Sequence, residues 1–249
     1  MGLRVVPVIA AALLALVGCG GVPTAGSSPA PLAPVTSAAP RPSSPTPSSI
    51  GPSPLSSLSA GYTSSVQPIP PAIAAEMTGV SWRPGCPVPL VDLRLVQLTY
   101  HGFDGLPHQG ELVVHRDVAD KIARIFGKLY AARFPVRKMV RIDAYGGSDD
   151  RSMADDNTSM FNCRNAYGSS KWSVHAYGKA IDVNTVENPY FPGSKVLPSA
   201  GAAYRNRNDV RPGMVVAGDA VVRAFAAEGF RWGGNWKTGT DYQHFEIGP

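Results

Sequence analysis

The chain has 249 residues, 24 of them proline, and a formal net charge of +5. Its Lys and Arg residues are scattered along the sequence and form neither a basic run nor a module that combines basic and aromatic residues. This distribution excludes a dedicated nucleic-acid-binding protein.

The N-terminus has the features of an export signal. Arg4 precedes an apolar run over residues 5–17, which is too short to span a bilayer as a stable helix. Leu16-Val17-Gly18-Cys19 is similar to a bacterial lipobox, in which the cysteine is lipid-modified after cleavage. We therefore expect residues 1–19 to be a signal peptide and Cys19 to attach the protein to the outer face of the cytoplasmic membrane. Ordinary cleavage beside an incidental cysteine is the alternative.

The next segment, residues 20–71, has the composition of a linker. It contains one charged residue, Arg41, and more than half of the 24 prolines. Such a segment cannot bury enough apolar surface to offset its chain entropy, so we expect it to be disordered. The rest of the chain, residues 72–249, has the size of one folded domain.

The sequence of the first half of this domain predicts strands followed by a helix. Apolar residues from Leu93 to Tyr100 indicate a strand with a break, residues 102–105 a turn, and residues 111–114 a second strand. A helix is expected to begin with Asp117 as N-cap and to end before Pro135. Its predicted buried stripe consists of Val118, Ile122, Ile125, Phe126 and Leu129.

A third strand is predicted over residues 140–145, and a second helix near the end of the chain. Asp219 would cap that helix and Gly229 would end it. Its predicted buried stripe consists of Val222, Phe225 and Ala226. Because strands and helices do not alternate regularly, the sequence predicts an α+β fold.

Two histidines and an aspartate, His175, Asp182 and His244, form a candidate zinc site. A catalytic zinc takes three nitrogen or oxygen ligands from the protein and keeps its fourth position open for water. Read as a strand, residues 180–183 direct Asp182 to one face and apolar neighbours into a core. Gly178 permits the turn that is needed between His175 and Asp182. Alternatively, both histidines are structural and the acids are surface caps.

Asp241, three positions before His244, is a candidate general base. A carboxylate close to a metal ion can take a proton from the attacking water without being a ligand itself. Glu246 shares the face of His244 and is the next candidate for this role.

The spacing Ser-x-His-x-x-Gly-x-Ala-x-Asp over residues 173–182, followed by Asp-x-x-His-Phe over residues 241–245, resembles a known family. The similarity is to the zinc D-alanyl-D-alanine carboxypeptidases and endopeptidases of bacterial cell walls, the VanY-like group. Residues 157–164 and 232–236 also resemble its actinobacterial members. The resemblance implies His175, Asp182 and His244 as zinc ligands, Asp241 as acid/base and peptidoglycan stem peptides as substrate. It further implies a single catalytic domain with a small antiparallel sheet and flanking helices, as in hedgehog and DD-peptidases.

The long segments 146–172 and 185–217 carry little periodicity, and we expect them to form walls of the substrate cleft. Arg164 is the preferred cation for a substrate carboxylate or the scissile carbonyl. Arg151 is its rival, because many relatives place the corresponding arginine further upstream, whereas this chain has Tyr145-Gly146-Gly147 in place of their Tyr-Arg-Ser. Further candidate cleft residues are Ser173, Tyr177, Trp172, Trp232 and Trp236.

Cys86 and Cys163 remain once Cys19 is assigned to the lipobox. An even number of thiols in an exported protein favours a disulfide. A nucleophilic Cys163 near His175 is the alternative, and it would make the protein a cysteine hydrolase.

Other functions remain open at this point. These motifs do not separate a D,D-carboxypeptidase from an L-alanyl-D-glutamate endopeptidase. The domain could also be a zinc-stabilised module that binds wall peptides without cleaving them, as hedgehog-like relatives suggest. We expect a monomer that faces the cell wall.

Overall fold

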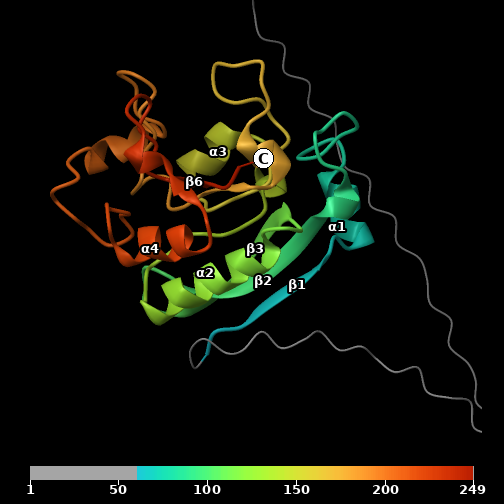
Figure 1. The fold of residues 1–249 in the computed structure, drawn as a ribbon, viewed down its shortest axis with the longest axis horizontal. Helices are drawn as coiled ribbons and strands as arrows, with labels where there is room; N and C mark the ends of the chain where they lie inside the picture. Colours follow the sequence, from blue (N-terminus) through green and yellow to red (C-terminus); the bar gives the residue numbers. More distant parts are fainter. Residues whose placement is uncertain (1–60, 249) are drawn as a thin grey trace, which may run out of the picture. The chain divides into compact units, whose positions relative to one another are not determined.

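The computed structural model describes residues 61–248 (Figure 1). The predicted signal peptide, Cys19 and most of the predicted linker lie outside this range. The described residues form two small antiparallel sheets with interspersed helices, which confirms the α+β prediction. In chain order the elements are β1 (Ser64–Pro68), α1 (Pro71–Met77), β2 (Leu93–His101), β3 (Pro107–His115), α2 (Ala119–Ala131), α3 (Asp149–Ala154), β4 (Ala180–Asp182), α4 (Ala220–Ala227), β5 (Arg231–Trp232) and β6 (His244–Glu246).

The first sheet has the order β1-β2-β3, with all neighbours antiparallel. β2 continues through the predicted break, and β3 is longer than the predicted strand over residues 111–114. A tight turn joins them, in which the N–H of Gly102 donates to the carbonyl of Leu106 (2.8 Å). β1 was not predicted, because a strand of Ser, Val, Gln and Pro lacks an apolar pattern. The predicted linker over residues 20–71 therefore extends too far toward the C-terminus.

Helix α2 lies along one face of this sheet (Figure 1). All residues of its predicted stripe are buried there against apolar side chains of β2 and β3. The predicted N-cap is wrong: Val118 takes that position, while the carboxylate of Asp117 lies 3.3 Å from the ring of His115. The helix ends at Ala131, and Arg133 then adopts a left-handed φ of 52°.

The other face of the sheet carries a second, smaller core. Leu93 and Leu95 alternate with the residues that face α2, and they pack against Met77. Cys163 belongs to this core and is bonded to Cys86, with the two Cα atoms 5.9 Å apart. This bond confirms the predicted disulfide and rules out Cys163 as a free nucleophile.

The second sheet has the order β4-β6-β5. Ile181 of β4 and Phe245 of β6 are directly opposite each other and point into the main core, as their period of two predicts. Helix α4 packs into the same core, and its N-cap is Asp219, as predicted. The predicted stripe of α4 is displaced, because Val221 and Ala224 are buried where Val222 and Ala226 were expected.

The predicted strand over residues 140–145 is wrong. Ile142–Tyr145 form a 3₁₀ helix, and Gly146 ends it with a left-handed φ of 59°. Ile142 is the single buried residue of this stretch, so no alternating apolar face exists. Within residues 61–248, no helix combines the length and the apolar content needed to cross a bilayer.

Candidate metal centre and active site

The pairing of β4 with β6 brings two of the candidate ligands together. Asp182 lies directly opposite His244 in the register of the two strands. Directly paired residues project to the same face of a sheet. The apolar neighbours Ile181 and Phe245 fix this register, because a slip of one residue would turn one of the two strands over and bring its candidate ligand into the core.

The third candidate ligand, His175, precedes β4 on the 3₁₀ helix Val174–Tyr177. The hydroxyl of Ser173 accepts a hydrogen bond from the N–H of His175 (3.3 Å) and caps this turn. Gly178 then reverses the chain with a φ of 65°, as the sequence predicted. A Cβ at this position would lie 2.6 Å from the backbone nitrogen of His115, so Gly178 also allows a close backbone approach.

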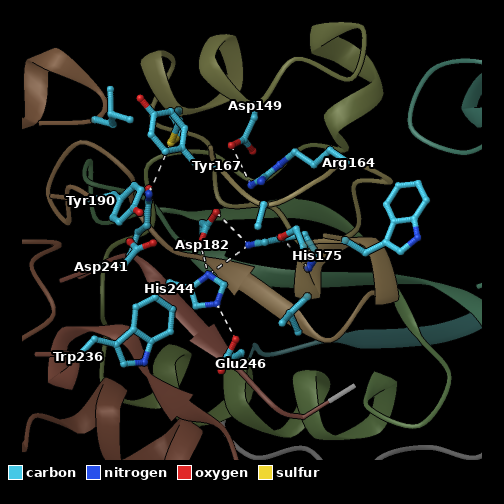
Figure 2. Close-up of a pocket in the computed structure, with 17 residues that line it drawn as sticks. Asp149, Arg164, Tyr167, His175, Asp182, Tyr190, Trp236, Asp241, His244 and Glu246 are labelled. Carbon is cyan, nitrogen blue, oxygen red and sulfur yellow. Dashed lines mark hydrogen bonds and ion pairs between the residues drawn. The ribbon is translucent and has the colours of Figure 1, made fainter. Parts of the chain in front are cut away.

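The three side chains converge at the floor of a pocket (Figure 2). Nε2 of His175 lies 3.2 Å from Oδ2 of Asp182, and Nδ1 of His244 lies 3.1 Å from Oδ1 of the same carboxylate. The two ring nitrogens are 3.2 Å apart. All ligand atoms lie within 4.8 Å of one another. The donor atoms of two imidazoles and one carboxylate are directed to one common position, and this set of ligands fits a zinc ion.

Each imidazole also has an acceptor for the ring nitrogen that faces away from this point. Nδ1 of His175 lies 2.6 Å from the carbonyl oxygen of Met160. Nε2 of His244 lies 3.3 Å from Oε2 of Glu246, which is itself paired with Arg231. These contacts place the ring protons on the outer nitrogens, so that Nε2 of His175 and Nδ1 of His244 present lone pairs to a metal.

The electrostatics of the cluster favour a cation. Burial alone would raise the pKa of Asp182, but the two histidines beside it hold that pKa well below its usual range. Burial alone would lower the pKa of His244, yet its contacts with Asp182 and Glu246 raise that pKa to about 10. In the absence of a metal the cluster therefore retains a proton, which a metal ion would displace.

Asp241 lies beside the cluster and is buried. Its Oδ1 has no hydrogen-bond partner within the part of the chain that the structure describes. Burial raises the pKa of Asp241 to about 8, an effect that His244 opposes and the Asp182 carboxylate reinforces. A buried carboxyl group that has one oxygen without a hydrogen-bond donor and a pKa near neutrality has the properties of a general base.

The pocket above the cluster has a volume of about 200 Å³. Arg164 lies in its wall, and Nη2 of this residue is 2.8 Å from Oδ2 of Asp149. Ser173 and Trp236 also line the pocket, and the Trp236 ring lies 5.2 Å from the ring of His244. These three predicted residues therefore surround the candidate ligands.

Two other predicted cleft residues lie elsewhere. Arg151 is exposed on α3, and its guanidinium donates to the carbonyl of Tyr145 instead of entering the pocket. Tyr177 packs against the second core. Among the tryptophans, Trp172 lines the pocket, whereas Trp232 is buried in the main core.

Several pocket residues were not predicted. Asp149 comes from the first turn of α3, and Tyr167 and Tyr190 come from the two long segments without periodicity. Figure 2 shows both tyrosines on the side of the pocket nearest Asp241. The sequence predicted that these segments form cleft walls, but it held no signal for the individual side chains.

Residues 167–247 match a family model described as D-alanyl-D-alanine carboxypeptidase, which confirms the resemblance seen in the sequence. The match contains the three candidate ligands and Asp241, whereas Asp149 and Arg164 precede it. No solved structure matches this chain. The family match and the cluster together support a peptidase with a metal site.

Proposed function

We propose that this protein is a zinc-dependent peptidase that hydrolyses peptidoglycan stem peptides and releases their terminal D-alanine. The observation that carries the proposal is the convergence of His175, Asp182 and His244, with buried Asp241 in the same pocket. The family match over residues 167–247 supports the substrate class.

The three candidate ligands, Asp241 and Arg164 each have a role in this reaction. A zinc ion held by the three ligands would polarise the scissile carbonyl and acidify the attacking water. Asp241 accepts the proton of that water and later passes it to the leaving amine. Arg164 donates to an oxygen of the substrate, either the scissile carbonyl or a terminal carboxylate.

The second candidate activity is cleavage of the bond between L-alanine and D-glutamate. A second hollow, lined by Val222, Phe230 and Trp236 among others, shares Trp236 and Glu246 with the catalytic pocket. This continuity favours a substrate that extends beyond one terminal residue.

The test is digestion of purified muropeptides by zinc-loaded protein, followed by mass analysis. Loss of one D-alanine from pentapeptide stems is the expected result. Separation of L-alanine from the rest of the stem would assign the endopeptidase instead. Binding of muropeptides without any cleavage, by a protein that holds stoichiometric zinc, would identify a binding module.

We further propose that the protein is exported and held at the outer face of the membrane by a lipid on Cys19. The apolar run over residues 5–17 and the lipobox-like Leu16-Val17-Gly18-Cys19 support this location. Cys19→Ser should move the protein from the membrane fraction to the medium. An unchanged membrane fraction would exclude the lipid anchor.

A further inference from the structure

Arg164 is the single Arg or Lys in the pocket wall among the residues that the structure describes. Its Nη2 contacts Oδ2 of Asp149 at 2.8 Å, and its Nη1 donates to the carbonyl of Asn165 at 3.3 Å. A guanidinium has five N–H donors, so these two contacts leave others for a substrate oxygen. Whether Arg164 can donate to a bound substrate therefore depends on where its guanidinium is held.

The backbone of Arg164 is fixed on both sides. The preceding residue, Cys163, is bonded to Cys86, and its N–H donates to the carbonyl of Ser81 (3.0 Å). The carbonyl of Arg164 accepts from the N–H of Ser173 (3.1 Å), two residues before the first candidate ligand. These contacts set the position of the main chain but leave the long side chain free to rotate.

The turn that precedes Asp149 is hydrogen-bonded to the segment that carries Arg164. The side-chain amide of Asn162 donates to the carbonyl of Gly147 (3.2 Å). Gly147 has a φ of 73°, and a Cβ there would lie 2.8 Å from the carbonyl oxygen of Val80. The Tyr-Gly-Gly sequence thus allows this turn to lie close against its neighbour, and the turn places Asp149 at the start of α3 over the pocket.

The pocket also contains carboxylates that compete for Arg164. Asp182, Asp241 and Glu246 all line it. A guanidinium that turned to Asp182 would meet a candidate metal ligand, and one that turned to Asp241 would neutralise the candidate base. Figure 2 shows Arg164 extended above His175, with its guanidinium directed to Asp149.

We propose that Asp149 is a positioning residue: its ion pair with Arg164 holds the guanidinium in the wall of the pocket, ready for a substrate oxygen and away from Asp182 and Asp241. The expected effect on catalysis rests on the proposed function. The orientation of Arg164 by Asp149 does not depend on it.

The kinetic test compares Asp149→Asn with Asp150→Asn. Both changes remove one negative charge from the first turn of α3, but Asp150 is exposed and does not line the pocket. Asp149→Asn should keep its zinc and lower kcat/KM for muropeptides about 10–100-fold, the effect of one lost charged hydrogen bond. Asp150→Asn should match the wild type. In an Arg164→Ala background, Asp149→Asn should have little further effect, because a positioning residue acts only through its partner.

A second measurement does not require activity. The Nε–H resonance of Arg164, assigned by its loss in Arg164→Ala, should move or broaden in Asp149→Asn and stay unchanged in Asp150→Asn. Equal spectra for the two variants, or additive kinetic effects in the double variant, would overturn the positioning role. A changed resonance in a protein that cleaves no muropeptide would uphold the role and reject the proposed function.

Discussion

Oε2 of Glu246 lies 3.3 Å from Nε2 of His244, on the side of the ring that faces away from Asp182. The same carboxylate is held by Arg231 (2.9 Å). A carboxylate behind a metal-binding histidine fixes the ring orientation and makes the ligating nitrogen more basic. Glu246 is therefore placed to orient the ring of His244 and not to accept a proton from the attacking water.

Glu246→Ala should weaken zinc binding about 10–100-fold, since this is the usual cost of removing such a partner. Competition with a chelator measures the affinity. Glu246→Gln, which keeps an acceptor for the ring N–H, should lose less. If Glu246→Gln instead keeps its zinc affinity and loses turnover, Glu246 is the base and its assignment as a support is wrong.

Replacement of any one of His175, Asp182 or His244 by alanine should reduce zinc content and abolish hydrolysis. Each change removes one of the three candidate ligands that converge in the described part of the chain. His108→Ala is the control, because His108 is an exposed histidine paired with Asp104 far from the cluster in the chain. Metal analysis after dialysis gives the result. Stoichiometric zinc in all three variants would exclude this ligand set.

Asp241→Asn should keep zinc and fold but lower kcat about 10²–10⁴-fold, the range that general acid/base groups supply. Burial raises the pKa of Asp241 to about 8, and only its ionised form accepts a proton. The rate should therefore rise with pH through that pKa. A bound cation favours the carboxylate, so the rise should lie below pH 8 in the zinc-loaded enzyme. A near-normal rate with the same pH profile in the Asn variant would show that Asp241 is not the base.

The double variant Cys86→Ser/Cys163→Ser should be less stable by about 2–5 kcal/mol, the typical cost of removing a native disulfide from a small domain. The bond joins residues 77 positions apart and anchors the segment that leads to Arg164. Urea unfolding measures the difference, and reduced wild type should resemble the variant. Equal unfolding midpoints for the variant and the oxidised wild type would contradict this.

Asp156 should make stability depend on pH. Its burial, together with the adjacent Glu187 carboxyl, raises its pKa from 3.8 to about 7 in the folded protein. The folded state therefore binds the proton more tightly, and this contribution to stability is complete below about pH 4 and lost as the pH rises to about 7. Relative to Asp156→Asn, the wild type should lose stability over this range in urea titrations. Asn is well tolerated at its left-handed φ of 54°. Parallel curves for the two proteins would contradict the shifted pKa.

The cluster of His175, Asp182 and His244 could be predicted from the sequence because its signal is local. Asp182 and His244 each stand in a short strand whose apolar neighbours, Ile181 and Phe245, specify which face the ligand takes. The glycine after His175 specifies the turn. These constraints involve only neighbours in the chain.

The individual side chains of the pocket walls could not be predicted, because long-range contacts determine them. The sequence favoured Arg164 but left Arg151 as a rival, and the disulfide and Asp149 hold Arg164 in the pocket wall. The wrong strand over residues 140–145 has the same origin, since two of the charged partners of Arg141, Glu111 and Glu76, lie in β3 and α1. β1 was missed because its pairing with β2, and not its composition, makes it a strand.

The pairing of Asp182 with His244 joins positions 62 residues apart. Closing a loop of this length has an entropic cost that must be met before the contact contributes any stability. The sheet β1-β2-β3 and α2, by contrast, are built from segments close to one another in the chain. The order of assembly should therefore place the candidate metal site among the last features to form. A chain that has folded only its first half has no hydrolytic centre, so catalytic competence itself reports that folding is complete.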